Sequence, residues 1–180
     1  IGVQESPAAV AAAERYRARE RVPLRIVVTP GPRFTLRSVR VVDPVSELPL
    51  TAEVLPPRTV PLHPGAPARS ADILAAQASI VDYFRRRSRP LARAEDPRVT
   101  VDHVAEVMDV TLFVSPGPVA GIGQVAVTGT RDVDPRVVSS YVYARPGDPY
   151  SPEAIASMRR SVLQIEALSS VRVREAHALD

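Results

Sequence analysis

Two stretches of the chain alternate apolar and polar residues, the pattern that predicts half-buried β-strands. They cover residues 98–103, Arg-Val-Thr-Val-Asp-His, and residues 108–114, Met-Asp-Val-Thr-Leu-Phe-Val, with a short connection at 104–106. Two such strands separated by a few residues predict a β-hairpin. One face of the second strand would be entirely apolar, with Met108, Val110, Leu112 and Val114.

Two further stretches place apolar residues three or four positions apart, which predicts amphipathic helices. Each begins with helix-start signals: Ser70 or Ser151 as the N-cap, and Pro152 at the favoured first helical position. The apolar stripes consist of Ile73, Ile80, Val81 and Phe84 in one helix and of Ile155, Met158, Val162 and Ile165 in the other. We expect the apolar stripe of each helix to pack against a β-sheet.

A weaker helical candidate precedes each long helix. Asp134 and Pro135 predict the start of a short helix over residues 134–141. The corresponding earlier region, residues 45–60, contains three prolines that allow one turn of helix at most: Pro49, Pro56 and Pro57.

The chain repeats itself at a spacing of roughly 85 residues. The tripeptide Pro-Gly-Pro occurs at 30–32 and again at 116–118, each time followed by a predicted strand. A second landmark, His-Pro-Gly-Ala-Pro at 63–67, corresponds to Arg-Pro-Gly-Asp-Pro at 145–149, and each precedes a long helix. Two independent landmarks at nearly one spacing predict two copies of one structural unit.

The expected order within a copy is strand, helix, helix, strand, strand. We therefore expect three parts: residues 1–30 as the C-terminal part of a first module, residues 31–116 as the second module, and residues 117–180 as the third module without its last strand. In the first part, Ser6 and Pro7 predict a helix start, and residues 22–29 predict a strand.

The amino-acid composition excludes several classes of function. The chain has 180 residues, 45% hydrophobic and 24% charged, which is typical of folded domains. It contains no cysteine, which excludes disulfides, thiolate nucleophiles and cysteine-ligated metals. All 23 basic residues are arginine and the net charge is only +3, so charge alone gives a weak indication of the partner. No apolar run reaches the length of a membrane-spanning helix.

The sequence contains no recognisable catalytic or cofactor-binding motif. Residues 121–126 match G-x-G-x-x-A, but that motif binds dinucleotides only where a helix begins within it, and Val125 and Val127 predict a strand instead. The three histidines lie in separate segments without ligand spacing. We expect no enzyme activity, no cofactor and no metal.

An arginine cluster ends the first long helix, and it leaves two interpretations open. Cations at a helix C-terminus complement the helix dipole. The same side chains could hold phosphates of lipid head groups, giving a helix-face or membrane-surface contact, or those of nucleic acid, although few aromatic residues accompany them. The cluster consists of Arg85, Arg86, Arg87 and Arg89.

These motifs together resemble POTRA domains. The resemblance rests on Gly31-Pro32-Arg33-Phe34 before the first strand, on Val127-Thr128-Gly129, and on Pro-Gly-Asp-Pro-Tyr-Ser at 146–151 before the second long helix. Within that superfamily the chain most resembles the TamA type, with BamA-like proteins and two-partner secretion transporters as alternatives. The resemblance implies an α+β fold of tandem modules, each a three-stranded mixed sheet with two helices on one face.

The resemblance also implies a location and partners. POTRA domains lie in the periplasm, attached to an outer-membrane β-barrel of the same chain, and assist in assembling or secreting other proteins. For a TamA-like protein, the expected partners are its own C-terminal barrel, a TamB-like protein anchored in the inner membrane, and unfolded outer-membrane proteins as clients. Nucleic acid is not an expected partner.

Two sets of residues follow as candidates for function. The strand before the last one forms a sheet edge in the family, and an edge offers unpaired backbone groups to an incoming chain. We therefore expect client or partner strands to pair with Arg98, Val99, Thr100, Val101, Asp102 and His103. Proline restricts the backbone angles of the chain, whereas glycine permits angles that other residues avoid. We therefore expect inter-domain hinges at Pro30, Gly31, Pro32, Pro116, Gly117 and Pro118.

Overall fold

The structure of the protein is a computed structural model that describes residues 25–27, 31–130, 133–176 and 178. Contacts divide the chain into two units, residues 1–32 and 33–180. The helix expected at Ser6 and the hinge residue Pro30 lie outside the described residues. Of the strand expected at 22–29, only 25–27 are described, and they belong to no helix or strand.

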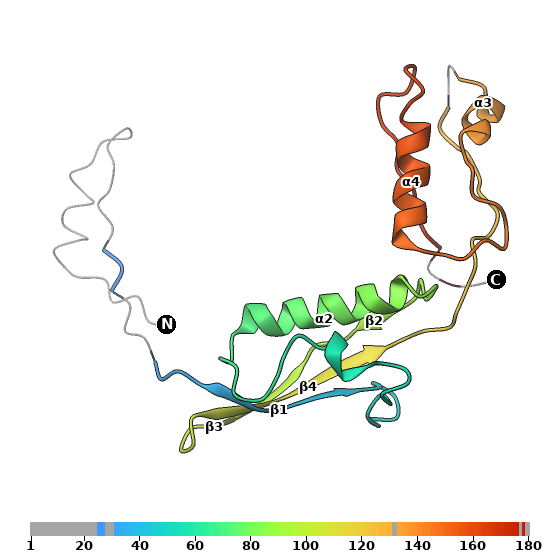
Figure 1. The fold of residues 1–180 in the computed structure, drawn as a ribbon. Helices are drawn as coiled ribbons and strands as arrows, with labels where there is room; N and C mark the ends of the chain where they lie inside the picture. The colour runs from blue at the N-terminus through green and yellow to red at the C-terminus, as the bar shows by residue number, and fades with distance from the viewer. Residues whose placement is uncertain (1–24, 28–30, 131–132, 177, 179–180) are drawn as a thin grey trace, which may run out of the picture. The chain divides into compact units, whose positions relative to one another are not determined.

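A four-stranded mixed sheet forms the centre of residues 33–116, the greater part of the expected second module. Its strands are β1 (Thr35–Val42), β2 (Arg93–Ala94), β3 (Arg98–Asp102) and β4 (Val107–Ser115). The central strand β4 runs parallel to β1 on one side and antiparallel to β2 and β3 on the other (Figure 1). The predicted hairpin is thus confirmed as β3–β4, and the α+β class with it. A parallel pair requires a crossover, and the crossover from β1 to β4 contains the long helix.

Helix α2 (Ser70–Arg85) covers one face of this sheet (Figure 1). The core between helix and sheet is fully apolar at its centre, with Ala76, Ile80, Phe84, Val110, Leu112 and Val114 nearly inaccessible to solvent. Before the helix, η1 (Pro57–Thr59) is a single 3₁₀ turn, as the prolines of this region predict.

The predicted start of α2 is wrong by one residue. Ser70 is the first helical residue, not the N-cap. Arg69 is the N-cap, because its carbonyl oxygen already accepts hydrogen bonds from the backbone N–H of Asp72 and of Ile73, both at 3.1 Å. No side chain caps this helix start.

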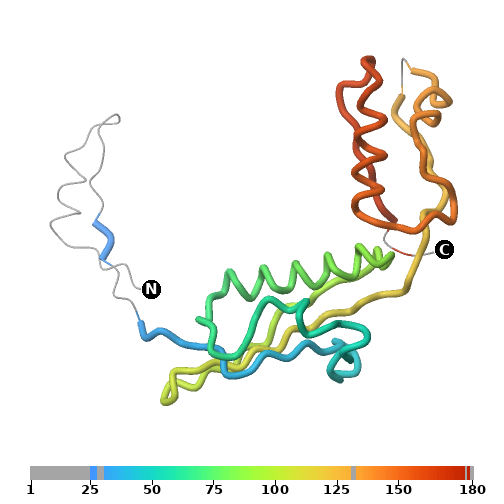
Figure 2. The backbone as a smooth tube through the Cα atoms, in the orientation of Figure 1, coloured from blue at the N-terminus to red at the C-terminus, as the bar shows by residue number. Residues whose placement is uncertain are grey.

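Among the described residues of the expected third module, the chain forms two helices, α3 (Pro135–Ser140) and α4 (Pro152–Val162) (Figure 2). Both N-caps are confirmed: Asp134 accepts a hydrogen bond from the N–H of Arg136 at 2.8 Å, and Ser151 accepts one from the N–H of Ala154 at 3.0 Å. The strands expected near Val125–Val127 and Val171–Arg174 are not formed among the described residues of 117–178, where the single backbone bridge joins Gly121 to Pro149.

No helix in the described part of the chain is both long enough and apolar enough to span a membrane.

Candidate functional site

Strand β3 is an edge of the sheet. Within the described residues it pairs with β4 alone, from Arg98 opposite Thr111 to Asp102 opposite Val107. The other side of β3 therefore offers its backbone N–H and C=O groups outward. The predicted edge strand is thus located at a sheet edge over residues 98–102.

The other edge of the sheet is already occupied at both ends. Near the start of β1, Leu36 donates its N–H to the carbonyl of Ala66 at 2.8 Å and accepts from the N–H of Gly65 at 2.7 Å. Near its end, Val41 accepts from the N–H of Leu50 at 3.0 Å. An incoming strand thus finds β1 partly covered, whereas β3 is open.

The two valines of β3 lie on the helix side of the sheet. Val99 pairs with Val110 and Val101 with Met108, and Val110 is fully buried against α2. Yet Val99 and Val101 remain 40% and 37% exposed, and Leu74 of α2 is 59% exposed. Apolar surface is therefore available beside the open edge for the side chains of an added strand.

A buried glutamine fixes α2 next to this edge. Gln77 donates from Nε2 to the carbonyl oxygen of Glu95 at 2.7 Å, in the segment between β2 and β3. A buried amide without this partner would carry a desolvation cost, so the bond holds helix and edge in one arrangement. The chain thereby preserves the spacing between α2 and β3.

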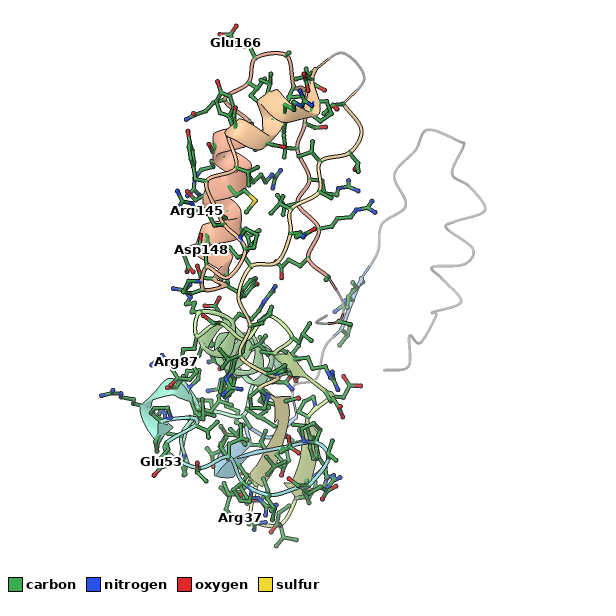
Figure 3. The ribbon with its side chains drawn as sticks, turned by 90° about the vertical axis from the view of Figure 1, so that its right-hand side faces the viewer. Arg37, Glu53, Arg87, Arg145, Asp148 and Glu166 are labelled. Atoms are coloured by element: carbon green, nitrogen blue, oxygen red, sulfur yellow. The ribbon has the colours of Figure 1, made fainter. Side chains whose placement is uncertain are left out.

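Polar side chains tie the strands together on the face away from α2. Arg37 of β1 donates to the carboxylates of Asp109 in β4 and Asp102 at the end of β3. The hydrogen bond from Arg37, followed by one from Ser38, lowers the pKa of Asp109 from its ordinary value of 3.8 to about 2. This network crosses three strands, and Figure 3 shows Arg37 at the sheet.

The last two predicted edge residues have structural roles in the hairpin turn. The Asp102 carboxylate accepts from the N–H groups of Ala105 at 3.0 Å and Val104 at 3.1 Å, and these bonds lower its pKa. His103 lies beyond β3, with its ring 5.5 Å from that of Phe34 in an edge-on contact. The open edge suited to pairing is therefore residues 98–101, with Asp102 and His103 shaping its end.

The arginine cluster lies at the end of α2, where it contacts residues that follow β4 in the chain. Arg85 donates to the Tyr150 hydroxyl at 2.8 Å and to Glu175, and Arg89 donates to the carbonyl oxygen of Gly117. Arg86 forms ion pairs with Asp82 at 2.7 Å and Glu153 at 3.3 Å.

Arg87, labelled in Figure 3, differs from its neighbours in the cluster. Its guanidinium lies over the Tyr83 ring, 4.2 Å from the ring centroid. Every predicted arginine of the cluster thus has a partner within the protein, and the suggested lipid contact stays a prediction.

Tyr150 is the centre of this joint. It is 5% exposed, and its hydroxyl donates to Glu175 at 2.9 Å while accepting from Arg85. Burial raises the pKa of this phenol. Ser88 adds two bonds: its hydroxyl donates to the Tyr150 carbonyl at 3.0 Å, and its own carbonyl accepts from the N–H of Ala120 at 2.7 Å.

The two predicted glycine hinges differ. Gly117 has a φ of +67°, and a Cβ placed on it would lie 3.1 Å from the carbonyl carbon of Leu91. Gly31 has open space around it. The joint at Gly117 is therefore held by neighbouring backbone, with Pro116 and Pro118 on either side.

Sequence reasoning missed Ser88, Tyr150 and Glu175 as joint residues. Tyr150 lies inside the Pro-Gly-Asp-Pro-Tyr-Ser motif, so the repeat could have marked it. Nothing in the local pattern of Ser88 or Glu175 indicates a partner 62 or 90 positions away. Among the described residues, no group of three or more histidine, aspartate or glutamate side chains could hold a metal ion.

The chain is similar to known proteins in its fold. No protein-family model matches the sequence, and no curated protein matches it either. Among solved structures, the chain is similar to POTRA domains 3–5 of BamA from Haemophilus influenzae, with a TM-score of 0.60 and 18% identity. That match covers 78% of this chain and 54% of the other.

A second similar structure is BamA from Haemophilus ducreyi lacking POTRA domains 1–3. Its TM-score is 0.58 at 12% identity, with 77% of this chain and 25% of the other covered. The chain thus spans about half the length of the first structure and a quarter of the second. At these identities the likeness concerns the fold, and the chain has the fold of POTRA domains.

Proposed function

We propose that this chain is the periplasmic POTRA region of an outer-membrane assembly or secretion protein, of the TamA type, and that it binds extended client polypeptides by strand addition at β3. The observation that carries the proposal is the difference between the two sheet edges. Among the residues that the structure describes, strand β3 pairs on one side only, whereas β1 is paired on its outer side at both ends. Strand addition relies on backbone hydrogen bonds, which suits a protein with many clients.

The environment of the edge defines which strands fit. An added strand directs alternate side chains to the helix side, where Val99, Val101 and Leu74 offer apolar surface. On the other face it meets Arg98 and Thr100. A client segment that alternates apolar and polar residues satisfies both faces, and such alternation is the pattern of transmembrane β-strands.

The partners proposed with this function are an outer-membrane β-barrel in the same protein and a TamB-like protein anchored in the inner membrane. The likeness in fold to BamA POTRA domains supports this class of protein. BamA-like proteins and two-partner secretion transporters remain the alternatives within it. Lipid or nucleic-acid binding by the arginine cluster is less favoured, because Arg85, Arg86 and Arg89 are engaged within the protein.

A pair of proline variants tests strand addition. Successive residues of a strand direct their N–H groups to opposite sides. One of the two substitutions Thr100→Pro and Val101→Pro therefore removes an N–H donor that faces β4, and the other removes an N–H donor that faces the open edge. The variant that keeps the melting temperature within a few degrees is the open-edge variant. It should lose at least tenfold in affinity for a fluorescent peptide of alternating apolar and polar residues.

The matching control removes side-chain charge instead of backbone. Arg86→Glu and Arg87→Glu alter the end of α2 and leave β3 intact, so peptide binding should persist in both. Unchanged peptide affinity in the folded proline variant, together with loss in the glutamate variants, would overturn strand addition in favour of a helix-face contact.

A further inference from the structure

Arg98 is the first residue of the open edge, on the face of the sheet away from α2. Its guanidinium lies over the ring of Phe113 in β4, 4.9 Å from the ring centroid. A cation in this position is attracted to the face of the ring. Phe113 is 8% exposed, whereas the Arg98 side chain is 61% exposed. The ring therefore holds the guanidinium at the edge, where solvent still reaches it.

A carboxylate of the same chain already binds this guanidinium. Glu47 accepts a hydrogen bond on Oε1 from Nη2 of Arg98, at 3.2 Å. A guanidinium carries several N–H donors. Among the residues that the structure describes, this is the one hydrogen bond that the Arg98 side chain donates. Its remaining donors are available to a second acceptor.

The turn that carries Glu47 is held in place by Asp43. The Asp43 carboxylate accepts from the N–H groups of Ser46 at 2.9 Å and Val45 at 3.0 Å. Its carbonyl oxygen accepts from the N–H of Glu47 at 2.9 Å. Glu47 has a φ of +54°, a conformation that residues with a Cβ seldom adopt. The chain thus keeps a carboxylate beside Arg98 in spite of an unfavourable backbone conformation.

The ion pair between Arg98 and Glu47 is one that a ligand can replace. The two side chains are 61% and 60% exposed. An exposed pair of this kind contributes little stability, because water solvates both charges. A strand added to β3 places alternate side chains on this face, next to those of Arg98 and Thr100. A carboxylate on that strand therefore reaches the Arg98 guanidinium at little cost to the fold.

Arg98 is also the charge that this face of β3 leaves for a client. Thr100 is uncharged. Asp102, on the same face, already accepts hydrogen bonds from Arg37 and from the N–H groups of Val104 and Ala105. The cation at the start of β3 is therefore the charge that an added strand meets.

We propose that Arg98 makes the β3 edge selective for client strands with an aspartate or glutamate at a polar position, and that this carboxylate replaces Glu47 on the Arg98 guanidinium. The inference rests on the proposed strand addition at β3. Backbone pairing then gives affinity for extended segments in general, and Arg98 ranks these segments by charge. A basic residue beside Arg98 is disfavoured, since like charges on neighbouring strands repel.

Three fluorescent peptides with blocked ends test the proposal on the full chain. They share one sequence of alternating apolar and polar residues and differ at the central polar position, which is glutamate, glutamine or arginine. At low salt the glutamate peptide should bind about two- to fivefold more tightly than the glutamine peptide, as expected for a cross-strand pair of opposite charge. The arginine peptide should bind most weakly. At about 1 M salt the differences should disappear, because the charges are screened.

Substitutions in the ion pair should change this ranking in opposite directions. Arg98→Gln should bind the three peptides equally, and Arg98→Glu should prefer the arginine peptide. Glu47→Gln should increase the preference for the glutamate peptide, because no carboxylate of the chain competes for Arg98. Arg40→Gln is the matched control, at an exposed arginine on the same face in β1, and should keep the wild-type preference. Melting temperatures within a few degrees of the wild type establish that each variant is folded.

Three outcomes would overturn the selectivity of Arg98. The first is equal affinity of the wild type for the three peptides at low salt, and the second is an unchanged preference in folded Arg98→Gln. The third is a preference in Glu47→Gln no greater than that of the wild type, because the client carboxylate would then not replace Glu47.

Failure of strand addition itself gives a different result. In that case the glutamine peptide binds the open-edge proline variant as tightly as it binds the wild type. If that variant loses the glutamine peptide while the wild type binds all three peptides equally, strand addition is retained and the role of Arg98 is wrong.

Discussion

Arg85 and Tyr150 lie 65 positions apart in the sequence, and the Arg85 guanidinium donates a hydrogen bond to the Tyr150 hydroxyl at 2.8 Å. Arg85 belongs to the last turn of α2, and Tyr150 directly precedes the N-cap of α4. The same hydroxyl donates to Glu175 at 2.9 Å, so one phenol connects three segments of the chain. The arginine cluster, for which the sequence predicts a role at the helix C-terminus or a helix-face or lipid contact, thus connects α2 to the segments around Tyr150, Glu175 and Gly117.

Removing this hydroxyl should loosen the joint. Tyr150→Phe keeps the ring and deletes both hydrogen bonds, so the free energy of unfolding should fall by about 1 kcal/mol. Because the chain contains no cysteine, spin labels at Ala78→Cys and Ser157→Cys report the distance between α2 and α4. Tyr150→Phe should broaden that distance distribution. Tyr143→Phe, at a ring that is 74% exposed, is the matched control and should leave it unchanged.

The Pro-Gly-Pro repeat offers its own internal comparison. Gly117→Ala forces a left-handed backbone on a residue with a Cβ, close to the Leu91 carbonyl, and should destabilise the protein by about 1 to 2 kcal/mol. Gly31→Ala introduces its methyl group into open space and should change stability by less than about 0.5 kcal/mol. Urea unfolding of both variants measures the difference. Equal effects would show that residues 116–118 are not a constrained joint.

Acid should destabilise the sheet through Asp109. Its pKa is lowered to about 2 in the folded protein, so the unfolded chain binds a proton first as pH falls. The stabilisation is therefore present above pH 4 and is lost between about pH 4 and pH 2. Asp109→Asn should flatten this part of the stability curve, measured by urea unfolding at several pH values. Glu53→Gln, an exposed change in the 43–60 loop, should keep the wild-type slope.

Substitutions at two residues of α2 should separate an effect on stability from an effect on peptide binding. Ile80 is fully buried, so Ile80→Ala should cost about 2 to 5 kcal/mol through lost burial and the cavity left behind. Leu74 is 59% exposed on α2, three residues before Gln77, whose amide bonds to the segment that leads into β3. Leu74→Ala should change thermal stability little and weaken binding of an alternating peptide several-fold. Equal peptide affinity in folded Leu74→Ala would exclude the helix side of the edge from the binding site.

Local signals in the sequence predicted local structure well. Alternation gave the β3–β4 hairpin, and capping residues gave the starts of α3 and α4 at Asp134 and Ser151. The predicted N-cap of α2 was wrong, because a serine next to a helix boundary resembles an N-cap whether it lies before or inside the first turn. Such one-residue ambiguity follows from the similar preference of polar residues for both places.

Contacts between distant segments were harder to predict. The covering of β1 by residues 48–50 and 65–68 depends on backbone bonds, which carry no side-chain signature. The bond from Arg85 to Tyr150 likewise depends on how two modules meet, whereas each residue alone has an ordinary local explanation. The open edge at β3 was predicted through the POTRA resemblance, and the alternating valines alone would not have distinguished an edge strand from a central one.

A comparison of the two sheet edges tests the central claim most directly. Photo-crosslinking residues are placed at Thr100 in β3 and, as the matched position, at Arg40 in β1; both are exposed and lie on the same face of the sheet. A peptide of alternating apolar and polar residues is added to each. Strand addition at β3 predicts a crosslink from Thr100 that a fivefold excess of unlabelled peptide removes, and little from Arg40. Equal crosslinking from both positions, or crosslinking from Arg40 alone, would contradict it.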